Sequence, residues 1–204
     1  MPLAAAFLIR PEIDIAVSQL FFVADQRFVL RGMWIDHLFD QYTKPVGLVL
    51  IGLFLGLYPI PLFKRPTGRD ILFVLSGFVL GVVVIVNGAL KGLMGRARPH
   101  QTESFGGTAE FTVACIPADQ CAGNCSFVSG DVAFACAFLS MALLTPVRMR
   151  GWCVALVMVL TVVIGAARIM RGSHYLSDVL FAALIMIALV FQMHRLFYRS
   201  PDTV

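Results

Sequence analysis

The sequence predicts an all-α integral membrane protein with five to six transmembrane helices, because its composition is apolar and its apolar residues come in long runs. The 204 residues are 59% hydrophobic and only 14% charged, with a mean hydropathy of +0.85. A soluble domain is about 45–50% apolar and about 25% charged. A soluble globular protein, a disordered chain and a nucleic-acid-binding protein are therefore excluded. At about 20 residues per span, the length allows five or six helices.

Five apolar runs approach or reach the length of a span without an internal charge. They are residues 45–63, 71–90, 132–147, 152–167 and 179–193. Lipid offers backbone groups no water partner, so these runs should be helical. They also lack the alternation of polar and apolar residues that barrel strands require.

Basic residues between and after these runs predict the orientation of the chain. Three clusters fall on one side if the runs alternate in direction, and the positive-inside rule makes that side cytoplasmic. The clusters are Lys64, Arg65 and Arg69, then Arg148 and Arg150, then Arg195 and Arg199. We expect the C-terminus on the cytoplasmic side and segments 91–131 and 168–178 on the outer side.

Residues 1–40 are predicted to form an N-terminal segment distinct from residues 41–204. Residues 1–9 are apolar but too short to span, and whether residues 1–22 cross the membrane is left open. Residues 10–38 are expected to form amphipathic segments at the outer interface, with Trp34 among the interfacial anchors.

Three cysteines lie in the long outer loop 100–127: Cys115, Cys121 and Cys125. An exported loop can hold a disulfide, and three cysteines permit one pair and one leftover thiol. Three free thiols are the alternative. A structural zinc site would need four ligands, and the loop offers no convincing fourth.

The two outer segments gather cations and a helix start. Lys91 and Arg98 are seven residues apart, which is two helical turns and one helix face. With Arg168, and with Ser129 and Gly130 opening a helix, they form a plausible phosphate cradle, because guanidinium groups and free helix amides bind oxyanions. Snorkelling towards lipid headgroups would explain any one of these cations. Arg96 and Arg171 are accessory candidates in the same segments.

His174 is the candidate nucleophile. Asp178 lies one helical turn away and can orient one ring nitrogen, which leaves the other free to attack. We expect no metal ion and no cofactor, since the surrounding cations would repel a divalent ion.

The same residues fall into three ordered blocks that resemble the type 2 phosphatidic acid phosphatase (PAP2) superfamily of integral-membrane lipid phosphatases. The family signature is Lys-x6-Arg-Pro, then Pro-Ser-Gly-His, then Ser-Arg-x5-His-x3-Asp. Here the blocks are Lys91, Arg98 and Pro99, then Val128-Ser129-Gly130-Asp131, then Ala167-Arg168, His174 and Asp178. The resemblance covers about residues 45–195.

The resemblance implies a PAP2-like six-helix bundle and a metal-independent, two-step reaction. His174 would attack phosphorus to give a phosphohistidine, with Asp178 as its orienting partner. The phosphoryl oxygens would be held by Lys91, Arg98, Ser129, Gly130 and Arg168. Asp131 replaces the histidine that protonates the leaving group in the family. Asp131 is the favoured acid and His100 a substitute, while the remaining alternative makes Asp131 a structural partner of Arg171 or Arg96.

The predicted function is a membrane lipid phosphatase of a bacterial inner membrane, acting on an envelope lipid at the periplasmic face. Its partners would be a membrane lipid substrate and the bilayer, with no nucleic acid. The substrate classes are lipid A, a polyprenyl pyrophosphate or a phospholipid. Residues 124–131 are similar to a bacterial branch that acts on lipids such as lipid A. The alternative is a non-catalytic protein that binds lipid phosphates or serves in a membrane complex, because Asp131 could lack the histidine's activity.

Overall fold

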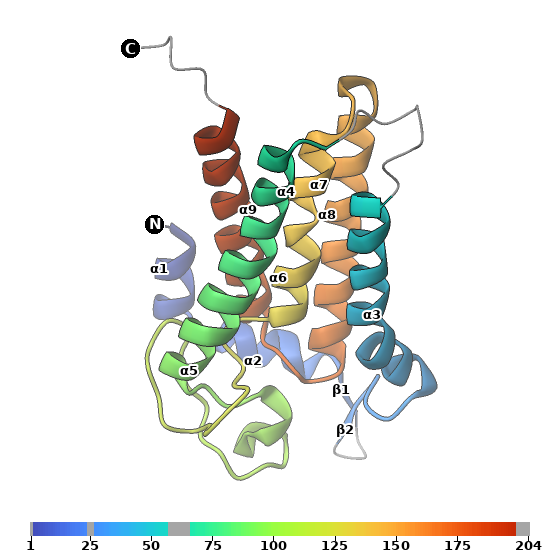
Figure 1. Ribbon diagram of the computed structural model, residues 1–204. Helices are drawn as coiled ribbons and strands as arrows, with labels where there is room; N and C mark the ends of the chain where they lie inside the picture. The colour runs from blue at the N-terminus through green and yellow to red at the C-terminus, as the bar shows by residue number, and fades with distance from the viewer. Residues whose placement is uncertain (1, 24–26, 57–65, 199–204) are drawn as a thin grey trace.

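The computed structural model describes residues 2–23, 27–56 and 66–198, and in them the chain is mostly helical with almost no strand. The long helices lie side by side in one bundle, and the longest loops gather at its lower end (Figure 1). The helices are α1 (Pro2–Ile9), α2 (Glu12–Gln19), α3 (Trp34–Gly56), α4 (Gly68–Ser76), the π-helical η1 (Gly77–Leu90), α5 (Lys91–Met94), the short 3-10 turns η2 (Pro99–Gln101) and η3 (Glu103–Phe105), α6 (Gly130–Ala137), α7 (Leu139–Leu144), α8 (Val147–Met170) and α9 (Leu176–Tyr198). A small antiparallel hairpin pairs β1 (Phe22–Val23) with β2 (Arg27–Phe28).

The apolar runs form the membrane-embedded bundle, as predicted. In the described part of the chain, three helical stretches are long and apolar enough to cross a membrane, Gly68–Gln101, Val147–Met170 and Leu176–Tyr198. Gly130–Leu144, which corresponds to the predicted run 132–147, is a shorter apolar helix. The run predicted at 45–63 begins inside α3, and residues 57–63 lie outside the described residues.

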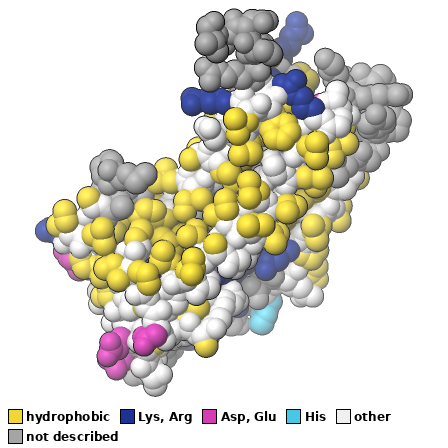
Figure 2. All heavy atoms as spheres, turned by 60° about the vertical axis from the view of Figure 1, so that its left-hand side comes forward, with side chains coloured by type: hydrophobic (Ala, Val, Ile, Leu, Met, Phe, Trp, Pro, Cys, Tyr) yellow, Lys and Arg dark blue, Asp and Glu magenta, His cyan; other side chains and the backbone are white. Residues whose placement is uncertain are grey.

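The basic clusters share one end of the bundle. The end of α3, the start of α4, the junction of α7 with α8 and the end of α9 all lie at the upper end of Figure 1. The cluster members Lys64, Arg65 and Arg199 are outside the described residues. On the face shown in Figure 2, a broad apolar band lies between Lys and Arg side chains at the upper end and Asp and Glu side chains at the lower end. Its chemistry suits contact with lipid tails.

Helix α6 lies at the centre of the core, where it packs against η1, α8 and α9. Val132 and Cys136 of α6 are fully buried together with Val86 and Met186 of the neighbouring helices. Cys136 thus acts as a small apolar side chain. This packing holds the start of α6, which is the second sequence block, between the elements that carry the first and third blocks.

The N-terminal segment is packed onto this bundle. Phe7 of α1 is buried against Phe181 of α9, and α2 lies across the loop-bearing end (Figure 1). Trp34 is 70% exposed, as an interfacial anchor would be. Helix α3 runs through residues 40 and 41 without a break, so the predicted division of the chain lies inside a helix.

Candidate active site

The first block is split by a sharp turn rather than carried on one helix. Helix α5 ends at Met94, and Gly95 adopts a left-handed conformation with φ of 52°. A Cβ at this position would lie 1.8 Å from the carbonyl oxygen of Ala118, so only glycine fits. Lys91 and Arg98 are therefore not two turns apart on one helix face, contrary to the sequence-based expectation.

Both cations nevertheless converge, because each binds Asn124. Lys91 Nζ donates to Asn124 Oδ1 at 2.9 Å, and Arg98 Nη2 donates to the Asn124 carbonyl oxygen at 2.8 Å. Asn124 has a φ of 48° and lies between Cys121 and Cys125, which form the disulfide. The expected single pair is thus Cys121–Cys125, and a small closed turn holds the residue that joins the two cations.

The third cysteine of the loop, Cys115, is a free thiol. Burial raises the pKa of this thiol, so it is less reactive than an exposed cysteine at neutral pH.

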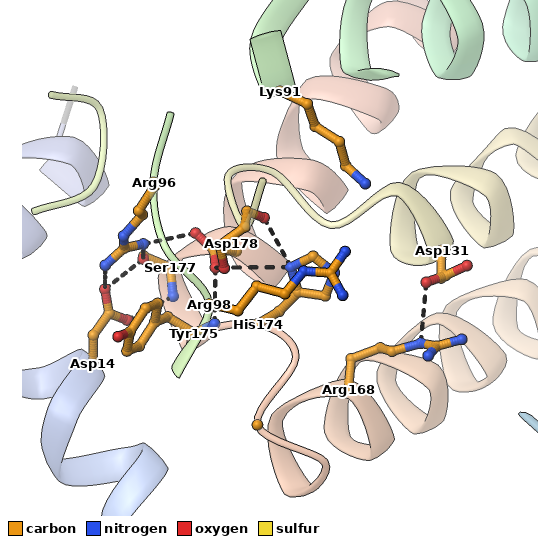
Figure 3. Close-up of polar contacts among 12 residues, drawn as sticks. Asp14, Lys91, Arg96, Arg98, Asp131, Arg168, His174, Tyr175, Ser177 and Asp178 are labelled. Atoms are coloured by element: carbon orange, nitrogen blue, oxygen red, sulfur yellow. Dashed lines mark hydrogen bonds and ion pairs between the residues drawn. The ribbon is translucent and has the colours of Figure 1, made fainter. Parts of the chain in front are cut away.

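A cavity of about 550 Å³ lies where the three blocks meet. Its cationic wall comes from the loop-bearing ends of several elements, and Figure 3 shows Lys91, Arg98 and Arg168 around His174 and Asp131. The lining residues are Lys44, Leu48, Val82, Asn87, Lys91, Arg98, Asn124, Gly130, Asp131, Phe134, Arg168, Arg171, Ser173 and His174. Of the described residues predicted for the site, four do not line it: Arg96, His100, Ser129 and Asp178.

His174 lies at the buried end of this cavity, only 2% exposed. Its Nδ1 is 2.8 Å from the carbonyl oxygen of Ser126. Because a carbonyl can only accept, Nδ1 carries the proton in the neutral ring and Nε2 keeps its lone pair. Burial lowers the pKa of His174 against the opposing effect of Asp178, which favours the neutral, nucleophilic ring at pH 7.

Asp178 does not hold His174 in the way that the spacing suggested. Its Oδ2 is 3.8 Å from His174 Nδ1, beyond hydrogen-bond distance. The same oxygen accepts from Ser126 Oγ at 2.5 Å and from the Tyr175 amide at 2.8 Å. Asp178 thus acts on the ring through charge and through Ser126, whose carbonyl is the direct partner. Sequence reasoning missed Ser126 because a backbone carbonyl leaves no residue-type signal.

Arg96 belongs to a buried network behind His174 and not to the phosphate cradle for which it was a candidate. Its Nη1 donates to Asp178 Oδ1 at 2.6 Å and to Ser177 Oγ at 2.8 Å. Its Nη2 donates to Asp14 Oδ2 at 2.8 Å, and its guanidinium carbon lies 4.2 Å from the centre of the Tyr175 ring. All its neighbours in this network are themselves buried (Figure 3).

The second block places Asp131 beside Arg168. Asp131 Oδ2 is 3.1 Å from Arg168 Nε, a partner that the sequence interpretation did not name. Gly130 opens α6, and a Cβ there would lie 3.0 Å from Asn87 Oδ1 and 3.4 Å from Lys91 Nζ. The missing side chain therefore leaves room for a ligand near the lysine and the first amides of α6.

Ser129 is the N-cap residue of α6. Its amide donates to the Asp178 carbonyl oxygen at 3.2 Å. Its Oγ is buried without a hydrogen-bond partner among the described residues, so this hydroxyl is available to form a hydrogen bond.

The two remaining accessory candidates, His100 and Arg171, contact neighbouring segments of the chain. His100 Nδ1 lies 2.8 Å from the carbonyl oxygen of Gly172, which holds the turn before His174. Arg171 lines the cavity and pairs with Asp36 of α3 through Nε at 2.9 Å. In the described ranges, no three His, Cys, Asp or Glu side chains come together in a group that could hold a metal ion.

The chain is similar to proteins named lipid A 4'-phosphatase. The chain is 32% identical over 195 residues to the lipid A 4'-phosphatase of Rhizobium leguminosarum, covering 87% of this chain and 84% of that protein. It is 28% identical over 202 residues to the lipid A 4'-phosphatase of Francisella tularensis subsp. novicida, covering 96% and 91%.

A solved structure shares the fold. A transmembrane PAP2-type phosphatidylglycerolphosphate phosphatase from Bacillus subtilis matches with a TM-score of 0.61 and 20% identity over 99% of this chain and 94% of that one. The model of the PAP2 superfamily matches residues 72–202, which include all three blocks. This chain is therefore a multi-pass membrane protein that belongs to the PAP2 superfamily.

Proposed function

We propose that the protein is a membrane lipid phosphatase that hydrolyses a phosphomonoester of an envelope lipid through a phosphohistidine at His174. The observation that carries the proposal is the bond from His174 Nδ1 to a backbone carbonyl, which leaves Nε2 as a lone-pair donor beside a cationic cavity. The lipid A 4'-phosphatases to which the chain is similar support a phosphorylated lipid of the lipid A class as substrate. Polyprenyl pyrophosphate and phospholipid remain the competing substrates.

The phosphoryl group is bound by charge and by helix amides. Lys91, Arg98 and Arg168 line the same cavity, and their positive groups neutralise the phosphoryl oxygens. The first amides of α6, exposed at Gly130, add donors at the positive end of the helix. In phosphoryl transfer, positioning and charge stabilisation supply most of the catalysis. The proposal assigns no step to a metal ion.

In the first step, Nε2 of His174 attacks phosphorus while the bond from phosphorus to the leaving oxygen breaks. The Nδ1 proton stays on the ring and remains hydrogen-bonded to the carbonyl oxygen of Ser126. Asp131 lines the cavity and gives its proton to the leaving oxygen.

In the second step, a water molecule attacks the phosphohistidine. Asp131, now a carboxylate, takes a proton from the water as the new bond to phosphorus forms. The bond from Nε2 to phosphorus breaks, inorganic phosphate leaves, and His174 returns to its neutral form. His100 is not favoured as the acid, because its ring is bound to Gly172 and does not line the cavity.

The location follows from the same features. The site lies at the end of the bundle opposite the basic clusters (Figure 1). With those clusters on the cytoplasmic side, the site faces the periplasm and the C-terminus is cytoplasmic. The disulfide in the site loop suits an oxidising compartment. We infer a bacterial inner membrane location.

A non-catalytic lipid-phosphate-binding protein is the second candidate, favoured by the ion pair that Asp131 makes with Arg168. A carboxyl paired with a guanidinium group would help to bind the phosphorylated lipid without donating a proton to it. The two functions differ in one readout, since a binding protein would retain phosphorylated lipid without releasing inorganic phosphate.

The test measures phosphate release by the purified protein in detergent. Lipid A, a polyprenyl pyrophosphate and phosphatidic acid are offered separately to the wild type, to His174→Ala and to His37→Ala, an exposed histidine of α3 used as the matched control. We expect release from lipid A, a loss of about 10⁴-fold or more in His174→Ala, and no change in His37→Ala. Folded protein that binds these lipids but releases no phosphate would contradict the proposal.

A further inference from the structure

We propose that Asp14, on the N-terminal helix α2, is a positioning residue for catalysis that acts on His174 through Arg96 and Asp178. The inference rests on the proposed function and extends the site to a helix outside the three sequence blocks.

Asp14 is only 1% exposed and is fully engaged. Its Oδ1 accepts from the Ser177 amide at 2.8 Å, and its Oδ2 accepts from Ser177 Oγ at 2.5 Å and from Arg96 Nη2 at 2.8 Å. A buried carboxylate is costly unless it is paired and hydrogen-bonded in this way. Asp14 therefore fastens α2 to the start of α9, the helix that carries Asp178.

Arg96 connects the two carboxylates. Its Nη2 faces Asp14 and its Nη1 faces Asp178 at 2.6 Å, both inside the protein. Nε donates to the Thr112 carbonyl oxygen at 2.8 Å, so the guanidinium cannot turn away from either partner. Because one cation is shared by two carboxylates, the group keeps one net negative charge on the side of His174.

This negative charge close to the His174 ring favours the first step of the reaction. When Nε2 bonds to phosphorus, the imidazole gains positive charge, and a nearby negative charge stabilises it. Without Asp14, Arg96 would neutralise Asp178 completely and the group would carry no net charge. Asp14 thus sets how much of the charge of Asp178 acts on His174.

Other charged groups also act on His174 and stay in place when Asp14 changes. Asp178 of α9 raises its pKa, and Arg98 and Lys91 lower it. Asp131 of α6 and Arg168 and Arg171 of α8 line the same cavity. A change at Asp14 therefore shifts the pKa of His174 while the contributions of these other groups stay the same.

The experiment compares Asp14→Asn with Ser18→Ala in the full-length protein. Asparagine keeps the shape of Asp14 and an accepting oxygen but removes the charge. Ser18 lies on the same helix, is equally buried, and its Oγ has no hydrogen-bond partner in the part of the chain that the structure describes. The readouts are kcat and the acid limb of kcat/KM against pH for phosphate release from lipid A.

We expect Asp14→Asn to lower kcat by about tenfold and to move the acid limb to lower pH by roughly half a unit, because the loss of a nearby negative charge lowers the pKa of His174. Ser18→Ala should match the wild type in both. The position of the limb does not depend on the fraction of folded protein, so a partly unfolded variant still reports it.

A loss of kcat in Asp14→Asn with an unmoved limb would overturn the inference, since it would show a structural role alone. Equal behaviour of the two variants would overturn it as well. Both results leave the proposed function standing, because the wild type would still release phosphate. A wild type that releases no phosphate would instead overturn the proposed function, and this inference with it.

Discussion

Two groups of charged residues lie on opposite sides of His174, and they are built in opposite ways. On the cavity side, Lys91, Arg98 and Arg168 share a wall with a single paired carboxylate, Asp131. On the buried side, Arg96 is shared by two carboxylates, and each of its three nitrogens donates to a protein acceptor. The cavity side carries an excess of positive charge, whereas the buried side pairs its one cation with two carboxylates.

The difference indicates that the cavity side serves to bind the substrate, whereas the buried side serves to support the fold. Positive charges held close together repel one another until an anion arrives, so the cavity side is expected to favour binding at the expense of stability. A fully hydrogen-bonded buried network is expected to stabilise the fold and to hold Asp178 and His174 in place. Variants on the two sides should therefore fail in different assays.

Among the charged residues, the largest effect is expected from Asp131→Asn, which tests the assignment of Asp131 as the acid. The amide oxygen can still accept from Arg168, but the side chain has no carboxyl proton to give. We expect kcat on the lipid to fall by about 10²–10⁴-fold, with a much smaller loss on an aryl phosphate, whose leaving oxygen needs no proton. Equal losses on both substrates would show that Asp131 only orients Arg168.

Lys91→Met tests whether the cavity side gains activity at the expense of stability. Loss of one phosphate-binding cation should lower kcat/KM by about 10²–10³-fold. The midpoint of thermal unfolding should stay the same or rise, because Lys91 shares the cavity wall with Arg98 and Arg168. Phosphate-release assays and thermal unfolding of the same preparation give both values. A clearly lowered midpoint would place Lys91 with the supporting residues instead.

Gly130→Ala tests whether the ligand needs the space at the start of α6. The added Cβ would lie 3.0 Å from Asn87 Oδ1 and 3.4 Å from Lys91 Nζ. We expect a loss of about tenfold in kcat/KM, since small displacements of a catalytic group are costly. The matched control is Gly92→Ala on α5, where a Cβ meets nothing within 4 Å. If the two variants have the same kcat/KM, the close approach at Gly130 has no role in binding.

Ser177→Ala should have the smallest effect on activity and a clear effect on stability. It removes a donor to Asp14 and an acceptor for Arg96 in a fully buried position. We expect the free energy of unfolding to fall by about 1–3 kcal/mol, with kcat/KM within about tenfold of the wild type. An unchanged unfolding midpoint would mean that the buried network does not stabilise the fold.

The fold was predictable because its signals are local. Within the described residues, each long apolar run is largely helical, and the described members of the basic clusters share one end as their spacing indicated (Figure 1). The sequence did not reveal that the first block breaks at Gly95. The left-handed turn depends on the close approach of Ala118, which lies 23 residues further along the chain and has no signature near Gly95.

The site was predictable only in part, for the same reason. Spacing brought Lys91, Arg168 and His174 into one group, and the structure places them around one cavity. The partner of Asp131 depends on how α6 packs against α8, and that choice among three arginines needs the fold. Asp14 contacts Ser177 across 163 residues, a pairing that no local pattern could indicate.

Asn124 is the one missed contact for which the sequence held a signal. An asparagine between two nearby cysteines in a polar loop favours a left-handed turn, and such a turn presents both the side chain and the carbonyl to neighbours. The structure uses both, one for Lys91 and one for Arg98.

In the proposed reaction, the phosphoryl group is transferred to His174 before it is transferred to water, and the stereochemical course at phosphorus tests this order. A small phosphate monoester made chiral with oxygen isotopes is hydrolysed by the wild-type protein in isotopically labelled water, and the configuration of the released phosphate is determined. Two successive in-line displacements, the first by His174 Nε2 and the second by water, predict retention of configuration. Inversion would show a single direct attack by water and would contradict the account.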